Sequence, residues 1–211
     1  MQSKLFSILF CCAVSNLLAS CKYNEPDSVI ENGVSRRTIL LQKADSAFLF
    51  CKKNKMDTTF CLLADMKMHS GKIRFFLFDF QTKSILDSGM VSHGCGANPW
   101  GKTSSKYNSS FSNKDGSHCT SLGKFKIGQR NYSQWGIHVN YFLYGLEATN
   151  NNAYKRTIVL HSWNDVPEGE VYPDGTPEGW GCPAINNSLM ERIDKKLQSA
   201  KSAVLLWQFY D

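Results

Sequence analysis

The amino-acid sequence predicts a mainly β domain, a β-sandwich or barrel with one helix before its strands and one helix near its end. Short apolar runs rich in β-branched and aromatic residues follow one another between residues 60 and 210, separated by glycine, asparagine and serine. Apolar residues at helical spacing occur before this region and near its end. With 211 residues, of which 42% are hydrophobic, the chain is long enough for a single domain with its own core.

The two predicted helices are set apart by composition and spacing. Residues 21–33 are polar and contain Pro26 and Gly33, so we expect a tether there. Residues 34–54 predict an amphipathic helix, because apolar residues recur along one helix face: Ile39, Leu40, Ala44, Ala47, Phe48 and Cys51. Residues 186–200 predict the second helix, which begins at an asparagine or serine.

The predicted strands lie between these helices and at the end of the chain. They cover residues 60–65, 73–80, 84–92, 123–128, 135–145, 156–162 and 203–210. Residues 99–122 are polar and rich in serine and asparagine, which predicts a large loop. Loops of this length in compact domains are usually functional or disordered.

The first residues predict export from the cytoplasm. A short positive start, "MQSK", precedes an apolar stretch that is too short for an ordinary spanning helix. The stretch ends in "LLASC", which resembles the lipobox of bacterial lipoproteins, so residues 1–20 are expected to be a lipoprotein signal peptide and Cys21 the lipid-bearing first residue. A plain secretory signal is the alternative. We expect an envelope protein that is held on the membrane by its N-terminal lipid and faces the periplasm.

Export changes the meaning of the cysteines. Of the eight in the chain, two leave with the signal and Cys21 would carry lipid. The five that remain are Cys51, Cys61, Cys95, Cys119 and Cys182. An odd number outside the cytosol leaves at least one thiol unpaired. Four cysteines can pair in three ways, and we favour Cys95 with Cys119, since both lie in glycine- and serine-rich loops; Cys182 is then available for chemistry.

Composition argues against several classes of partner. The formal charge of +6 is spread along the chain with no dense basic block, so a nucleic-acid partner is not expected. His93, Cys95, His118 and Cys119 form a nominal zinc-like set, but their spacing follows no known knuckle. Glycine-rich phosphate motifs and a Gly-x-Ser-x-Gly elbow are absent from the sequence. We therefore expect a monomer with no cofactor and no metal.

The chemical candidates are one cysteine and one upstream histidine. Cys182 stands in the turn "PEGWGCPAI", and His161 ends the apolar run "RTIVLHS". A nearby imidazolium or a helix N-terminus would lower the thiol pKa, and Pro183 suits the first turn of a helix. The backbone N–H groups of Gly181 and Cys182 could stabilise an oxyanion. The alternative is a buried structural thiol beside a core histidine.

Four blocks of sequence resemble a known family. "VSHGCG" at 91–96, "FSNKDGSHCTSLGKFKIG" at 111–128, "NNAYKRTIVLHS" at 151–162 and "WGCPA" at 180–184 occur in the order found in the murein L,D-transpeptidase catalytic domain family, a divergent YkuD-type branch. The resemblance covers about residues 73–209.

The resemblance implies a YkuD-like fold in residues 34–211 and gives roles to several residues. Cys182 would be the nucleophile and His161 the general base, with Ser162 orienting the imidazole through its backbone carbonyl. The residues expected to form the substrate pocket are His93, Gly94, Ser112, Asn113, Ser121 and Trp180.

The chain also departs from the family pattern. Glu178 and Gly179 stand where family members usually have arginine and serine, so a polar side chain is missing from the site and an acid stands nearby. Cys119 replaces a usual serine. "SHGC" ending at Cys95 mimics the tetrad of the better-known transpeptidase branch, but the matching upstream segment has no histidine, so Cys95 is not expected to be the nucleophile.

These observations predict cysteine-dependent acyl transfer on peptidoglycan stem peptides through a Cys182 thioester. An amine from a second stem would complete L,D-transpeptidation, and water would give L,D-carboxypeptidase trimming. The alternatives are a murein hydrolase that uses the same Cys–His pair and a non-catalytic peptidoglycan-binding lipoprotein.

Overall fold

The computed structural model describes residues 30–31 and 34–211. The expected signal peptide, Cys21, which was expected to carry lipid, and most of the expected tether lie outside the described residues. Within the described part, strand β1 (Ile30–Glu31) pairs antiparallel with β2 (Val34–Ser35). None of the helices described there is long and apolar enough to cross a bilayer.

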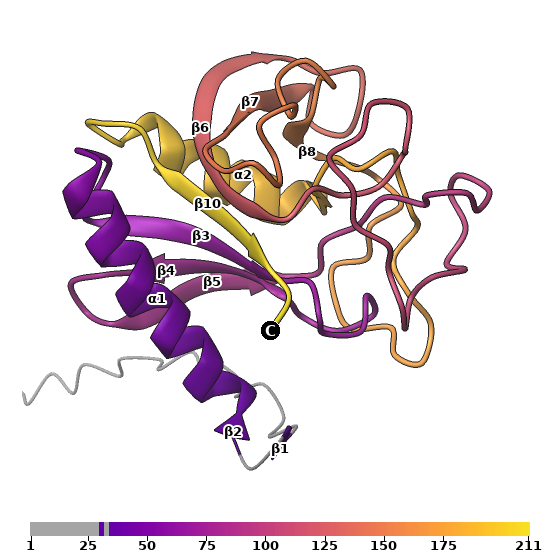
Figure 1. Ribbon diagram of the computed structural model, residues 1–211, viewed down its shortest axis with the longest axis horizontal. Coiled ribbons are helices and arrows are strands. Elements are labelled where there is room, and N and C mark those ends of the chain that lie inside the picture. The colour runs from indigo at the N-terminus through magenta and orange to yellow at the C-terminus, as the bar shows by residue number, and fades with distance from the viewer. Residues whose placement is uncertain (1–29, 32–33) are drawn as a thin grey trace, which may run out of the picture.

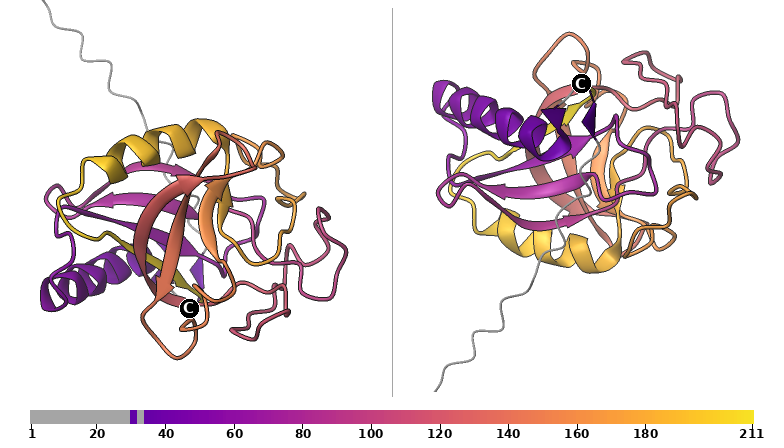
Figure 2. Two further views of the ribbon diagram at one scale, coloured as in Figure 1. Left: turned by 90° about the horizontal axis from the view of Figure 1, so that it is seen from above. Right: turned by 90° about the horizontal axis from the view of Figure 1, so that it is seen from below.

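The fold is mainly β, as predicted, and is built on one strongly curved sheet that nearly closes into a barrel (Figures 1 and 2). The order across the sheet is β5-β4-β3-β10-β6-β7-β8-β9. Most neighbours are antiparallel, but β10 with β3 and β8 with β9 are parallel pairs. The bounds are β3 (Phe60–Asp65), β4 (Phe75–Asp79), β5 (Ser84–Gly89), β6 (Gly123–Tyr132), β7 (Val139–Gly145), β8 (Val159–Ser162), β9 (Ala184–Ile185) and β10 (Leu205–Phe209).

Helix α1 (Arg36–Lys53) covers one face of this sheet. The Ser35 hydroxyl caps it by accepting from the Thr38 N–H, which satisfies one of the free donors of the first turn. Its buried residues recur at intervals of three and four, as one helix face requires, and pack on β3, β4 and β10. The expected N-terminal helix is therefore confirmed.

Helix α2 (Asn187–Gln198) lies on the opposite side of the strands (Figure 2). The Asn186 side chain caps it by accepting from the Leu189 N–H at 2.8 Å. Leu189, Met190 and Ile193 are fully buried in the core between α2 and the inner face of the sheet. This core fixes the positions of β8 and β9, which carry the candidate site.

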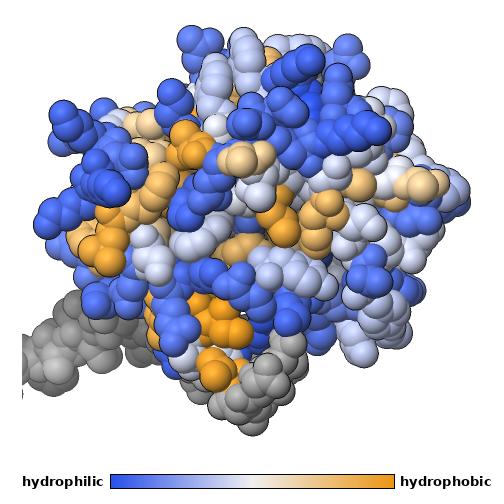
Figure 3. Space-filling model, in the orientation of Figure 1, coloured by the Kyte–Doolittle hydropathy of each residue, from blue (hydrophilic) through white to orange (hydrophobic). Residues whose placement is uncertain are grey.

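The outer surface differs from this apolar core in composition. On the face viewed in Figure 3 hydrophilic residues predominate, and the hydrophobic colours form separate small areas, several of them over α1. Leu41 and Leu49 are exposed on that helix. Scattered exposure of this kind is normal for folded proteins and needs no partner to explain it.

Strand β9 was not predicted from the sequence: residues 184–185 form it, and it pairs with the end of β8. The helix after Cys182 begins at residue 187 with Asn186 as its cap, close to the expected start at residue 186. Residues 99–122 contain no strand or helix, as expected, and are held by turns and by a bridge between Phe111 and Thr120.

Candidate active site

A cavity of about 450 Å³ opens beside the end of β8. Its lining combines one thiol, one imidazole, four indoles and three small residues. They are Ser92, Trp100, Trp135, His161, Trp163, Gly179, Trp180, Cys182 and Ala184. The two residues singled out from the sequence, Cys182 and His161, therefore share one cavity. The parallel pairing of β8 with β9, with His161 opposite Ala184, brings their segments side by side.

His161 is held in one orientation at the end of β8. Its Nδ1 lies 2.9 Å from the carbonyl oxygen of Ser162, the contact expected from the sequence. A carbonyl only accepts, so Nδ1 carries the proton and Nε2 keeps its lone pair. Burial lowers the pKa of His161, an effect that the Ser162 carbonyl partly offsets. The ring is therefore a neutral base at pH 7.

Cys182 lies in the turn just before β9. Its sulfur accepts from the Val159 N–H at 3.4 Å and directs its proton to the Thr157 carbonyl at 3.8 Å. Burial raises the pKa of the thiol, while the Val159 N–H and the charge of Arg156 act in the opposite direction. The thiol is neutral at rest.

The raised pKa of the Cys182 thiol contradicts the expectation that this pKa would be lowered. That expectation required an imidazolium or a helix N-terminus next to Cys182. His161 is neutral, and β9 separates the cysteine from α2. Neither source of positive potential is in place.

The turn before Cys182 presents two backbone donors. Gly181 has φ +103°, and a Cβ there would lie 2.4 Å from the Cys119 carbonyl oxygen, so only glycine fits. Within the described part of the chain, neither the Gly181 nor the Cys182 N–H has a hydrogen-bond acceptor. Two adjacent free N–H groups beside a thiol have the arrangement that an oxyanion requires.

Arg156, to which no role was assigned from the sequence, supports this turn through the segment that packs against Gly181. Its guanidinium donates to the Ser112 carbonyl at 2.9 Å, to the Ser121 hydroxyl at 2.7 Å and to the Cys119 carbonyl at 2.7 Å. It therefore links the two ends of the loop at 112–121 to Cys119, the residue of that loop that packs against Gly181. The only sequence signal was its place in the block "NNAYKRTIVLHS".

Ser112, Asn113 and Ser121, which were expected to contact substrate, do not line the cavity. The Ser121 hydroxyl donates to the Ser112 carbonyl at 3.1 Å and accepts from Arg156. The Asn113 amide donates to the Ala148 carbonyl at 3.0 Å. Their polar groups hold the loop together, because a long irregular segment must satisfy its own backbone.

His93 and Gly94 also lie outside the cavity lining, which begins at the preceding residue, Ser92. His93 is completely buried; its Nδ1 accepts from Arg74 and its Nε2 contacts the Ser105 hydroxyl, both at 3.0 Å. Burial lowers the pKa of His93 to about 3. Gly94 packs so tightly that a Cβ would lie 2.1 Å from the His118 carbonyl oxygen.

Glu178 belongs to this buried network and is turned away from the cavity. Its Oε1 accepts from the Ser105 N–H at 2.5 Å and lies 3.8 Å from His93 Nε2. Its backbone accepts from Gly101 at 2.9 Å and donates to Lys102 at 2.8 Å. The acid expected near the site therefore fastens the long loop to the turn that carries the cysteine.

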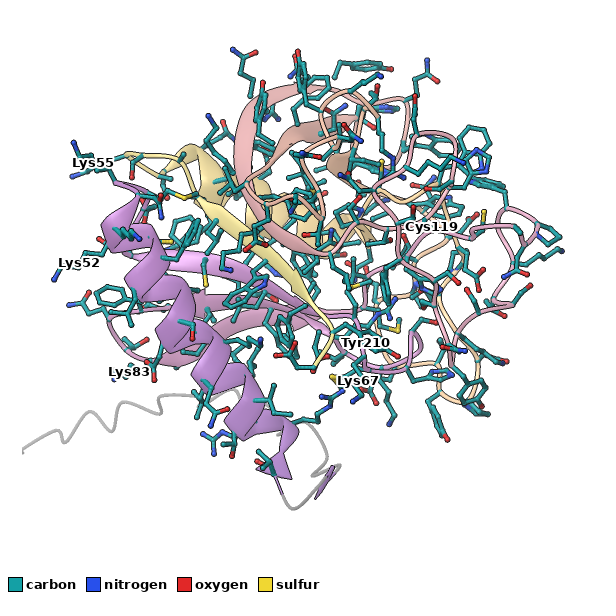
Figure 4. The ribbon with its side chains drawn as sticks, in the orientation of Figure 1. Lys52, Lys55, Lys67, Lys83, Cys119 and Tyr210 are labelled. Carbon is teal, nitrogen blue, oxygen red and sulfur yellow. The ribbon has the colours of Figure 1, made fainter. Side chains whose placement is uncertain are left out.

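The remaining cysteines and histidines are not part of the cavity. Cys95 is buried, and its sulfur contacts the Gly96 carbonyl at 3.7 Å. The five cysteines of the described region are all free thiols, so the favoured pair of Cys95 with Cys119 is not formed. Cys119 lies in the long loop, on the side of the molecule away from the upper end of α1 (Figure 4). No group of three metal ligands occurs among the described residues, and His118 instead stacks on Trp180 at 5.2 Å.

Three of the cavity tryptophans were missed. Trp100 comes from the long loop, Trp135 from the turn between β6 and β7, and Trp163 from the residue after β8. Trp180 was expected and is present. Nothing in the sequence spacing relates the three missed residues to one another, because only the tertiary fold brings them together.

A thiol, an oriented neutral imidazole and two adjacent free backbone donors lie together here, and these are the groups that cysteine acyl transfer would use. The chain belongs to the L,D-transpeptidase catalytic domain family, whose model matches residues 34–207.

Solved structures with a similar chain trace are distant in sequence. One is the helical cell shape determining protein Pgp2 from Campylobacter jejuni, with 11% identity and a TM-score of 0.46 over 72% of this chain and 48% of that chain. Its K307A mutant has 11% identity and a TM-score of 0.47, over 81% and 56%. Another is an L,D-transpeptidase (residues 123–326) from Xylanimonas cellulosilytica, with 9% identity and 0.41 over 76% and 68%. The chain thus covers about half of the Pgp2 chains. The curated proteins contain no significant match.

Proposed function

We propose that the protein transfers peptidoglycan stem peptides through a thioester on Cys182. The observation that carries the proposal is the shared cavity of Cys182 and His161, in which the Ser162 carbonyl fixes the imidazole with Nε2 as the proton acceptor. Membership of the L,D-transpeptidase catalytic domain family supports the substrate class.

The proposed first step is attack of the sulfur on the carbonyl between a diamino acid and D-alanine. The thiol proton leaves the Thr157 carbonyl and passes to His161 Nε2 as the S–C bond forms. The N–H groups of Gly181 and Cys182 hold the resulting oxyanion. When the C–N bond breaks, the imidazolium gives its proton to the leaving D-alanine amine. No further ionised group is needed, since both partners begin neutral.

The proposed second step releases the acyl group. An amine of a second stem attacks the thioester and forms a cross-link, or water attacks and leaves a trimmed stem. In either case His161 takes the proton of the nucleophile and returns one to the sulfur. A thioester suits a reaction with two possible acceptors, because it remains reactive towards amines.

A direct test uses the full chain with a disaccharide-tetrapeptide and intact-protein mass spectrometry. We expect D-alanine release and an acyl adduct that maps to Cys182. Both disappear in Cys182→Ser and fall sharply in His161→Gln, whereas Cys95→Ser, a buried thiol outside the cavity, retains them. An adduct on Cys95, or binding of the muropeptide without products by folded wild-type protein, overturns the proposal. Cleavage of cross-linked dimers with no release from the monomer favours the hydrolase.

A carbapenem gives an independent probe, because this class of β-lactam acylates the nucleophile in related enzymes. We expect labelling of Cys182 in the wild type and none in Cys182→Ser. Labelling elsewhere contradicts the assignment of the nucleophile.

The cellular location is a separate proposal that rests on residues 1–21. We infer that Cys21 carries lipid and anchors the protein to the envelope membrane, facing the periplasm. Metabolic labelling with palmitate tests this. Wild-type protein should incorporate label and Cys21→Ala should not, and unlabelled wild-type protein rules out the anchor.

A further inference from the structure

The tryptophan wall of the cavity, defined as Trp100, Trp135 and Trp163, has a geometry that limits what it can bind. The ring centroids lie 4.9 Å apart for Trp100 and Trp163, 5.9 Å for Trp100 and Trp135, and 6.0 Å for Trp135 and Trp163. Nothing fits between rings at these separations. Trp163 is only 5% exposed, but Trp100 and Trp135 are 44% and 46% exposed. The usable surface is therefore the outer faces of these two rings.

The wall is held on backbone that is already fixed. Trp163 donates its N–H to the Ile185 carbonyl at 2.9 Å. The turn that carries Trp135 is attached to β8, since the Ile137 N–H donates to the Ser162 hydroxyl at 2.9 Å. The loop at Trp100 is fastened by the backbone of Glu178. Large exposed aromatic rings that are held rigidly in a cavity indicate a binding surface.

The charge of the cavity indicates which kind of ligand group the wall suits. None of the lining residues is an acid, a lysine or an arginine, and the two titratable ones, Cys182 and His161, are neutral. A ligand cation therefore meets no carboxylate in the lining. The faces of indole rings carry negative potential and attract cations. In the reaction proposed above, the cationic group that must reach the thioester is the amine of the acceptor stem.

We propose that the tryptophan wall binds the ammonium group of the acceptor stem by cation–π contact and thereby favours cross-linking over hydrolysis of the thioester. This inference rests on the proposed function. It adds a binding site for the second substrate next to the nucleophile and the base.

An aromatic wall suits an amine that must lose protons before it attacks. Pairing with a carboxylate would raise the amine pKa by about 1–3 units and make the attacking form about 10- to 1000-fold rarer. A tryptophan face attracts the cation by about 2- to 30-fold in affinity, and its apolar surroundings disfavour the charged form. The ammonium first releases one proton to solvent. The neutral amine then forms the amide bond as the C–S bond breaks, and its proton passes through His161 to the sulfur.

Binding of a simple cation tests the wall without any turnover. Choline and its neutral isostere 3,3-dimethyl-1-butanol are titrated into the full chain, with tryptophan fluorescence as the readout. We expect choline to bind about 2- to 30-fold more tightly than the isostere. Trp135→Leu and Trp100→Leu should lose this preference, and Trp135→Phe should keep part of it. Trp207→Phe, a tryptophan outside the cavity, is the matched control. Equal binding of both ligands, or binding of N-acetylglucosamine without a response to choline, overturns the inference.

The product ratio separates this inference from the proposed function. Disaccharide-tetrapeptide is supplied as donor and acceptor, and cross-linked dimer and trimmed tripeptide are quantified. The ratio of dimer to tripeptide should fall about 2- to 30-fold in Trp135→Leu and stay unchanged in Trp207→Phe. If the wild type forms neither product, the proposed function fails. If both products form and the ratio is the same in every variant, only the wall is refuted.

Discussion

Replacing Gly181 by alanine tests the turn that we propose holds the oxyanion. The new Cβ would lie 2.4 Å from the Cys119 carbonyl oxygen, where ordinary contacts begin at 3.4 Å, so the two segments must separate by about 1 Å. A misplacement of that size at a reacting centre costs about 100-fold in rate. The backbone at φ +103° adds about 1–3 kcal/mol of strain. For a domain of this size the strain lowers the melting temperature by about 2–12 °C.

Gly116→Ala is the matched control. Gly116 also has a positive φ, +69°, but a Cβ there meets no atom within 4 Å. This variant therefore carries backbone strain without displacing the turn. The assay is the rate of Cys182 acylation by a carbapenem, followed by intact mass, together with thermal unfolding of each variant. The reasoning is refuted if folded Gly181→Ala acylates within about threefold of Gly116→Ala.

The remaining predictions concern three other groups. Because burial lowers the pKa of His93 to about 3, the unfolded chain binds a proton there below pH 6.5 that the folded chain does not. Stability in urea should therefore fall by up to about 1.4 kcal/mol per pH unit between pH 6.5 and 3, and His93→Gln should remove that slope; an equal slope in the variant contradicts this. Alkylation of Cys182 by iodoacetamide should still increase above pH 9, since burial raises the pKa of the thiol, and a plateau by pH 8 would exclude this. Arg156→Lys should lose about 1.5–3 kcal/mol for each partly buried charged hydrogen bond broken to residues 112–121, measured by thermal unfolding. Arg192→Lys, at an exposed pair, should lose less than about 1 kcal/mol, and equal losses would argue against a supporting role for Arg156.

Much of the fold could be predicted because its elements follow local rules. The helix at 36–53 buries residues at intervals of three and four, and that spacing is visible in the sequence. Strand β3 (60–65) has the predicted bounds, because a short apolar run ends there at polar residues. The short strand β9 could not be predicted. Pro183 suits the first turn of a helix equally well, and a two-residue strand exists only because β8 lies beside it.

The candidate site was only partly predictable, for a similar reason. Cys182 and His161 follow from residue chemistry and from their place in a motif. The direction of the Glu178 side chain, away from the cavity, depends on the loop at Ser105, which lies far from it in sequence. The same holds for Trp100 and Trp135, whose contact with Trp163 is purely tertiary.

The neutral resting state of the site follows from its burial and has a consequence for the proposed reaction. A thiolate is the form of cysteine that reacts with oxidants and stray electrophiles. Cys182 stays protonated because burial outweighs the Val159 N–H and the charge of Arg156, and His161 stays neutral for the same reason. Charge develops only when a carbonyl group of the substrate reaches the sulfur, since only then can the N–H groups of Gly181 and Cys182 stabilise an oxyanion. In the proposed reaction, substrate entry is therefore the event that activates the nucleophile.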